Sequence, residues 1–156
     1  MEYINEIFDK IGSDNINYYG QLEPSDKYTQ GIDVKVSTRL QPHHGELYTI
    51  QPHQAPAVYF LADDKGYLVK IGQSANLHNR MNRQYKCVTN ATNNRIREHI
   101  RSVSPLKVYY IPLEQHSIDA FGYELKTSYS SALEYHLLKE YKKSYDRLPE
   151  LNTMIK

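Results

Sequence analysis

The sequence contains no tryptophan, a single cysteine and no long uninterrupted apolar run. One cysteine, Cys87, cannot form an intramolecular disulfide, which fits a reducing compartment. No apolar stretch approaches the roughly 20 residues that a membrane-spanning helix needs, so we expect no membrane contact. Residues 1–10 are amphipathic and acidic, unlike a signal peptide. We therefore expect a cytoplasmic protein.

Tyrosine is present in unusual number. The 156 residues include 15 Tyr but only 3 Phe, while 40% of the residues are hydrophobic and 24% are charged. This length suits one domain with a core of its own. Tyrosine fills volume and keeps a polar tip, so the simplest interpretation of most tyrosines is a core with a hydrated edge.

Positive charge is concentrated in the middle of the chain. Residues 65–101 contain eight Lys or Arg and one acid, Glu98, whereas residues 1–64 contain four bases and ten acids. The local excess of seven positive charges predicts a surface that binds phosphate groups. The alternative is a solvated helix face without a ligand.

The first third of the chain has the weakest pattern. Apolar residues at helical spacing predict a helix over residues 2–11. Residues 12–55 are rich in Gly, Pro, Ser and Asp, and two short alternating stretches, 32–36 and 47–50, are candidate strands. We interpret residues 1–55 as an N-terminal extension packed on the core.

The core, residues 56–156, begins with two strand-like runs. Residues 57–62 are apolar, and the turn sequence Asp63-Asp64-Lys65-Gly66 separates them from a second run over residues 67–71. Two such runs with a short turn between them predict an antiparallel hairpin.

Helices and one strand follow this hairpin. The predicted order is a helix over 75–85 capped by Ser74, a helix over 91–102, a strand over 106–111, a loop over 113–127 and a helix from Ser130 or Ser131 to Tyr145. Pro149 lies beyond the end of the last helix. This order predicts an α+β fold in which helices flank a small antiparallel three-stranded sheet.

Five short motifs in the core resemble those of the GIY-YIG nuclease domain. They are Ala57-Val58-Tyr59, Lys70-Ile71-Gly72, Leu77-His78-Asn79-Arg80, Ala132-Leu133-Glu134 and Leu148-Pro149-Glu150-Leu151-Asn152. Each motif alone is common, but the five occur in the family's order and on the expected elements. The resemblance covers residues 56–152, roughly two-thirds of the chain.

The resemblance implies a set of site residues. The residues that it implies for catalysis are Tyr59, Lys70, Arg80, Tyr85 and Glu134. Glu134 is expected to hold the metal, one Mg²⁺ or Mn²⁺ ion per active site. Gly72 and Asn152 are expected to have structural roles.

The chemistry of these residue types fits the implied roles. Glu134 offers a hard oxygen ligand to Mg²⁺, which keeps most of its water molecules and needs few protein ligands. Arg80 offers a permanently charged planar fork for phosphate oxygens. By resemblance, Tyr59 is the candidate general base, although an unperturbed phenol ionises at about pH 10. Lys70 could supply the cation that lowers this pKa, or could itself bind the attacking water or the phosphate.

Three positions depart from the family's usual pattern. Ala57 replaces a glycine in the first motif, and Lys70 replaces a tyrosine in the second. Some members, including small type II restriction enzymes, also carry lysine there. Gln84 occupies a position that is often His or Tyr, and a small shift of the helix end could present Tyr85 instead.

The implied activity is that of a metal-dependent DNA endonuclease, which hydrolyses phosphodiester bonds. We expect a stand-alone enzyme of the type II restriction kind that cuts double-stranded DNA at specific sites as a homodimer. A phage or mobile-element nuclease of relaxed specificity is the second interpretation. A catalytically weak nucleic-acid-binding protein with the same fold is the third.

DNA contacts are expected from two parts of the chain. The first is the extension over residues 1–55, a candidate DNA-contacting arm. The second is the pair of basic helices. The residues expected to contact DNA there are Arg83, Lys86, Asn93, Asn94, Arg95, Arg97 and Arg101.

Overall fold

The computed structural model describes residues 2–12, 14–26, 31–37, 54–84, 91–114 and 116–153. The predicted strand over residues 47–50 lies outside these ranges, as do Tyr85 and Lys86. No helix within them is long and apolar enough to cross a bilayer.

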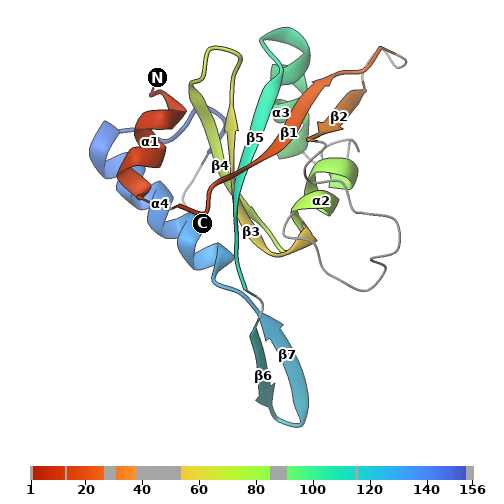
Figure 1. Cartoon of the computed structure of the whole chain (residues 1–156), viewed down its shortest axis with the longest axis vertical. Coiled ribbons are helices and arrows are strands. Elements are labelled where there is room, and N and C mark those ends of the chain that lie inside the picture. Colours follow the sequence, from red (N-terminus) through yellow and green to blue (C-terminus); the bar gives the residue numbers. More distant parts are fainter. Residues whose placement is uncertain are drawn as a thin grey trace.

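Five strands form the central sheet (Figure 1). In spatial order they are β2 (Ile32–Val36), β1 (Asn17–Pro24), β5 (Leu106–Pro112), β3 (Ala57–Ala62) and β4 (Leu68–Ser74). Every neighbouring pair is antiparallel. The predicted α+β class is confirmed, but the predicted three-stranded sheet is too small. The two further strands, β1 and β2, come from the N-terminal extension.

The sequence of β1 is not typical of a strand. Gly20 lies within it and Pro24 at its end, and both residue types usually interrupt strands. Gly20 fits here because a Cβ at this position would come within 2.9 Å of Val36 Cα on β2. The register with β5 shifts between Tyr18 and Gly20, and such a bulge interrupts the alternation of apolar and polar residues.

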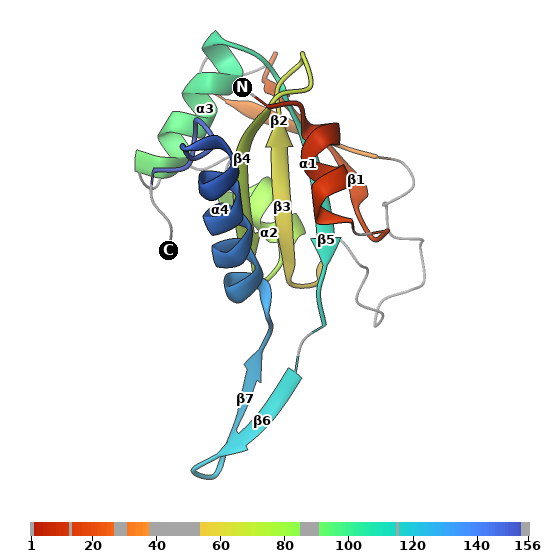
Figure 2. The same cartoon turned by 90° about the vertical axis from the view of Figure 1, so that its left-hand side faces the viewer.

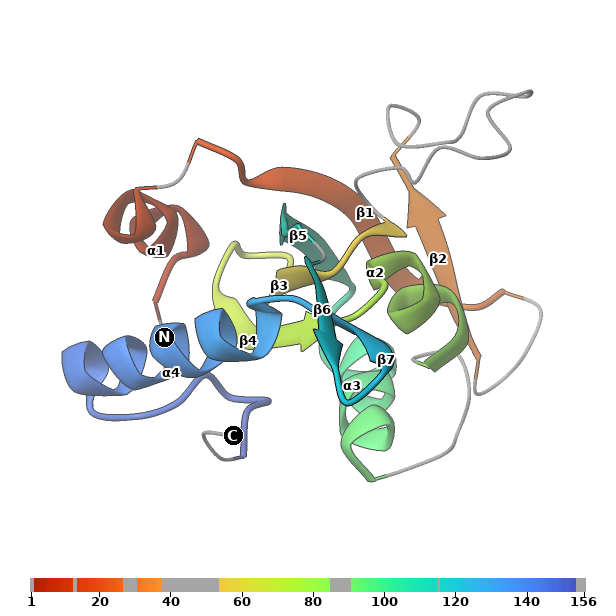
Figure 3. The ribbon, with the colours of Figure 1, turned by 90° about the horizontal axis from the view of Figure 1, so that it is seen from below.

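Helices cover both faces of the sheet, so that the body has three layers (Figures 2 and 3). α1 (Ile4–Ile11) and α4 (Ser130–Tyr145) lie on one face. The short α2 (Leu77–Asn79), the π-helical segment η3 (Arg80–Gln84) and α3 (Ala91–Ser102) lie on the other. Each face therefore has its own hydrophobic core, and the sheet separates the two.

The predicted helices agree with α1, α3 and α4, whereas the helix expected over 75–85 differs in two ways. It begins at Leu77, and the side chain of Asn76 accepts a hydrogen bond from Asn79 N at 2.9 Å. Asn76 is therefore the capping residue, and the prediction of Ser74 is wrong. From Arg80 onward the segment is a π-helix. This form is rare in proteins, but where it occurs it is often at a functional site.

A second hairpin replaces the loop that we predicted over residues 113–127. It consists of β6 (His116–Ala120) and β7 (Tyr123–Thr127), which pair only with each other among the described strands. Its turn residues, Phe121 and Gly122, both have positive φ, at 52° and 81°, as a two-residue hairpin turn requires. The sequence did not reveal this turn because Phe-Gly is not one of the usual pairs. Figures 1 and 2 show that the hairpin extends away from the body.

Candidate active site

Tyr59 and Gly72 are opposite each other on β3 and β4. Tyr59 is 2% exposed, and its ring lies directly over the backbone of Gly72. A Cβ on residue 72 would come within 2.8 Å of Tyr59 Cε2 and closer still to Cζ and the hydroxyl oxygen. The absence of a side chain at Gly72 therefore makes room for the tyrosine ring.

Lys70 lies on the same face of the sheet as Tyr59. It is opposite Leu61, and Leu61 is two residues along β3 from Tyr59. Opposed residues of an antiparallel pair share a face, as do residues two apart in a strand. Lys70 is only 9% exposed, although lysine is rarely buried. The structure thus brings the predicted lysine and tyrosine to one buried face of the β3–β4 hairpin.

Arg80 begins η3 and turns its guanidinium toward the end of β4. Its Nη2 donates a weak hydrogen bond to the Gln73 carbonyl oxygen at 3.4 Å. Its Nε is buried and has no hydrogen-bond partner among the described residues. A buried donor on a permanent cation is costly to leave unsatisfied, so this group suits an anionic ligand such as a phosphate oxygen.

Glu134 lies one turn into α4, and Gln73 connects this helix with Arg80. The Oγ of Ser130, at the start of α4, donates to Gln73 Oε1 at 3.1 Å. The Gln73 backbone accepts from Arg80, so one residue holds both elements at the end of β4. Glu134 follows Ser130 by four residues and is half-buried. Gln73 directly follows the Lys70-Ile71-Gly72 motif but was not predicted as a site residue.

Glu134 is the predicted metal ligand, and a single carboxylate suits a metal that keeps its water. Among the described residues there is no group of three or more His, Cys, Asp or Glu that could hold an ion. A single carboxylate such as Glu134 fits Mg²⁺, which proteins commonly bind through one or two carboxylates together with substrate phosphates.

A partly buried hydrogen-bond network connects η3 to β1. Asn82 Nδ2 donates to the Tyr19 hydroxyl at 3.0 Å, and this hydroxyl lies 2.9 Å from His78 Nδ1. Burial raises the pKa of Tyr19 to about 12 and lowers the pKa of His78, so at pH 7 the phenol is protonated and the imidazole neutral. Tyr19 is therefore the donor and His78 the acceptor. None of these residues was predicted to have a role, because Tyr19 belongs to the weakly patterned extension.

Asn152 pairs with the backbone of β4. Its Oδ1 accepts from Ile71 N at 2.9 Å, and its Nδ2 donates to Ile71 O at 2.8 Å. The preceding residue, Leu151, donates its backbone N–H to Val69 O at 2.8 Å. The C-terminal segment thus satisfies backbone groups on the outer edge of β4, next to Lys70 and Gly72.

The comparisons with known proteins give matches in structure only. No protein family model matches the chain, and no curated protein matches its sequence. The chain is similar to a solved structure of bacteriophage T4 EndoII, a glutamate-to-alanine mutant, with 17% identity over 97% of this chain and 100% of that one, at a TM-score of 0.61. It is also similar to the restriction endonuclease HPY188I in complex with product DNA, with 17% identity over 99% of this chain and 92% of that one, at a TM-score of 0.56. The chain shares the fold of both.

The basic helix α3 flanks the face that carries Tyr59 and Lys70. Arg95 and Arg101 are exposed on it, and Arg95 donates to Glu150 O at 3.4 Å. Arg97, by contrast, is only 6% exposed, so its side chain points into the protein. This burial does not favour the predicted DNA contact of Arg97, because a helix that packs on a sheet turns one side toward the protein.

The other predicted DNA contacts have no described side chain. Arg83 lies in η3, and Asn93 and Asn94 lie in α3, but their side chains are outside the described part of the chain. Lys86 and the candidate catalytic Tyr85 lie outside it altogether.

Proposed function

We propose that the protein is a metal-dependent DNA endonuclease of the GIY-YIG type, which hydrolyses phosphodiester bonds in double-stranded DNA. The observation that carries this proposal is the burial of Tyr59 and Lys70 on one face of the β3–β4 hairpin, with Gly72 leaving room for the tyrosine ring. The fold shared with EndoII and with a restriction endonuclease seen in complex with product DNA supports it.

Arg80 is the proposed phosphate ligand. Its buried Nε and its Nη2, which reaches only 3.4 Å from a carbonyl oxygen, leave donor capacity for phosphate oxygens. Arg80 donates to the carbonyl oxygen of Gln73, whose neighbour Gly72 faces the Tyr59 ring, so a phosphate bound by this guanidinium would lie near the Tyr59 hydroxyl.

Tyr59 and Lys70 are the groups that we propose to activate the attacking water by removing its proton. Lys70, on the same face, stabilises the phenolate form of Tyr59 by its positive charge, and this phenolate accepts the proton of the attacking water and becomes a neutral phenol. Around buried side chains the dielectric constant is low, so the attraction between the lysine ammonium and the phenolate is stronger than it would be in water. Without Lys70, the phenol would keep its proton at neutral pH.

Glu134 is the proposed ligand of a Mg²⁺ or Mn²⁺ ion, which would supply Lewis-acid stabilisation of the leaving oxygen when bound. Exposed Arg95 and Arg101 are proposed to contact the DNA backbone. Cleavage of both strands at a symmetric site calls for two copies of the chain, so we propose a homodimer of the type II restriction kind.

Incubation of plasmid DNA with the full chain and Mg²⁺ tests this function. Wild-type protein is expected to cut, and Glu134→Ala is expected to lose at least about 100-fold in rate because the metal loses its ligand. Glu140→Ala is the matched control, since Glu140 is an exposed carboxylate on the same helix. This variant is expected to cut at the wild-type rate.

The pattern of products distinguishes the alternatives. Discrete bands that Glu134→Ala removes support a restriction enzyme, and a smear supports a nuclease of relaxed specificity. Salt-sensitive DNA binding with no cleavage in either Mg²⁺ or Mn²⁺ would overturn the enzymatic proposal in favour of a binding protein.

A further inference from the structure

The hydrogen-bond network of Tyr19, His78 and Asn82 lies on one side of the segment formed by α2 and η3, and Arg80 lies on the other. His78 and Asn82 are four residues apart, so their side chains share a side of the segment. Arg80 is two residues from each, and two helical positions correspond to roughly half a revolution. The segment therefore contacts β1 through His78 and Asn82 and reaches β4 through Arg80.

Three polar atoms of the network lie within hydrogen-bonding distance of one another. The Tyr19 hydroxyl is 3.0 Å from Asn82 Nδ2 and 2.9 Å from His78 Nδ1, and the last two atoms are 3.1 Å apart. Asn82 Nδ2 also donates to the His78 carbonyl oxygen at 3.1 Å. The Asn82 amide thus ties η3 both to β1 and to the α-helical turn before it.

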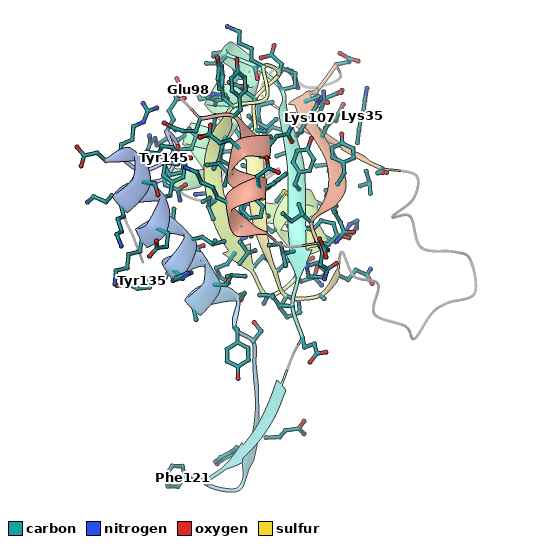
Figure 4. The ribbon with its side chains drawn as sticks, turned by 60° about the vertical axis from the view of Figure 1, so that its left-hand side comes forward. Lys35, Glu98, Lys107, Phe121, Tyr135 and Tyr145 are labelled. Atoms are coloured by element: carbon teal, nitrogen blue, oxygen red, sulfur yellow. The ribbon has the colours of Figure 1, made fainter. Side chains whose placement is uncertain are left out.

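Apolar contacts also hold this segment against the sheet. Leu77 and Met81 are fully buried in the core on this face. Figure 4, in which α1 lies in front of the sheet, shows α2 behind it. Burial of apolar surface has no preferred direction, whereas a hydrogen bond weakens steeply when its angle changes. The network therefore fixes the rotation of the segment about its own axis more tightly than the apolar contacts do.

Arg80 depends on this segment because its own hydrogen bonds hold it only weakly. Nη2 donates to the Gln73 carbonyl oxygen at 3.4 Å, and the buried Nε makes no hydrogen bond with the described residues. A buried donor without a partner is unfavourable, so a guanidinium that could move freely would turn to water. The position of Arg80 at the end of β4 therefore follows from the way in which η3 is held.

We propose that Tyr19, His78 and Asn82 are positioning residues, which aim the guanidinium of Arg80 at the scissile phosphate. The network fixes the rotation of η3 before DNA arrives, so that the Nε–H of Arg80 is already in place for a phosphate oxygen. This inference rests on the proposed function, in which Arg80 binds the phosphate. It makes cleavage depend on the Tyr19 hydroxyl, which belongs to a strand of the N-terminal extension.

Nuclear magnetic resonance on the full chain without DNA or metal tests the positioning. The Nε–H resonance of Arg80 is assigned by its loss in Arg80→Lys. In the wild-type protein this hydrogen is expected to exchange slowly with water, because Nε is buried. Tyr19→Phe keeps the ring and removes only the hydroxyl. It is expected to speed the exchange about tenfold, as the loss of one hydrogen bond would.

Tyr18→Phe is the matched control, since it removes a hydroxyl from the neighbouring residue of β1, whose ring packs against Tyr109 instead. It is expected to leave the exchange of Arg80 unchanged, and thermal unfolding by circular dichroism checks that every variant folds. The proposal would be overturned by equal exchange in Tyr19→Phe and wild type, or by the same acceleration in both phenylalanine variants. A wild-type Nε–H that exchanges as fast as that of an exposed arginine would overturn it as well.

Plasmid cleavage separates positioning from general stabilisation. Tyr19→Phe is expected to lower the cleavage rate about tenfold in the wild-type chain but to have little further effect in Arg80→Lys, because the group that it positions is then absent. A loss of the same size in both backgrounds would show that the hydroxyl acts other than through Arg80. If the wild-type chain does not cut, the proposed function fails, whereas the exchange measurement still decides whether the network positions Arg80.

Discussion

Gly72 sets the position of the Tyr59 ring, because only a residue without a side chain leaves space for it. Gly72→Ala is expected to displace the ring and to reduce plasmid cleavage about 100-fold, since small misplacements of reacting groups are costly. The clash is also expected to lower the free energy of unfolding by about 1–3 kcal/mol, as overpacking does elsewhere. Plasmid assays and urea denaturation measure the two effects.

A double variant identifies the cause. If the contact with the ring is responsible, Gly72→Ala should cost no further stability in a chain that already carries Tyr59→Ala. Wild-type cleavage by Gly72→Ala alone would show that the position of the ring does not matter for activity.

Some site residues could be predicted from the local sequence, and others could not. Tyr59, Lys70 and Arg80 lie within short motifs of fixed spacing, so each could be named from its neighbours. Gln73 takes part through a contact with Ser130, 57 residues away, and Tyr19 through contacts with residues about as distant. Such contacts have no local signature, because only the fold brings the partners together.

Asn152 stabilises the edge of β4, because its side-chain amide makes the two hydrogen bonds with Ile71 that a neighbouring strand would make. Asn152→Ala leaves the N–H and C=O of Ile71 without these partners. The free energy of unfolding is expected to fall by about 1–3 kcal/mol, measured by urea denaturation. Thr153→Ala, at the exposed next residue, is the control and should be neutral. Equal stability of the two variants would contradict the bracing role of Asn152.

Elements with a regular apolar pattern, either an unbroken run or residues at helical spacing, were predicted well. β3 is buried along its whole length and reads as an unbroken apolar run, and α4 matches the predicted span from Ser130 to Tyr145. β1 and the hairpin of β6 and β7 were not predicted. Besides β2, β1 pairs with β5, which lies far along the chain, and the hairpin pairs with none of the other described strands.

The stability of the whole molecule is expected to fall on acidification in two steps. Burial lowers the pKa of His78 below its ordinary 6.5. Burial raises the pKa of Glu2, but hydrogen bonds from Tyr141 and Arg147 outweigh this, so that its pKa lies below the ordinary 4.5. In each case the unfolded chain binds a proton before the folded one does. The free energy of unfolding therefore decreases as the pH falls below 6.5, and again below 4.5.

Thermal unfolding midpoints measured across this range check the prediction. His78→Asn, which keeps a hydrogen-bond acceptor for Tyr19, is expected to flatten the upper step, and Glu2→Gln is expected to flatten the lower one. A wild-type midpoint that rises between pH 6.5 and pH 5 would contradict the assignment to His78, because protonation would then stabilise the fold.

The strand order β2-β1-β5-β3-β4 also has a consequence for the chain during its synthesis. Of the five strands of the sheet, β1 and β2 are made before the others, yet β1 gains its second neighbour only when Pro112 at the end of β5 has been made. Until then β1 and β2 are a lone pair of strands with an open edge, and α1 lacks the helix α4 against which it packs. The N-terminal half therefore cannot complete its fold until the C-terminal half has been made. This delay lengthens the time during which open strand edges of nascent chains can associate with one another.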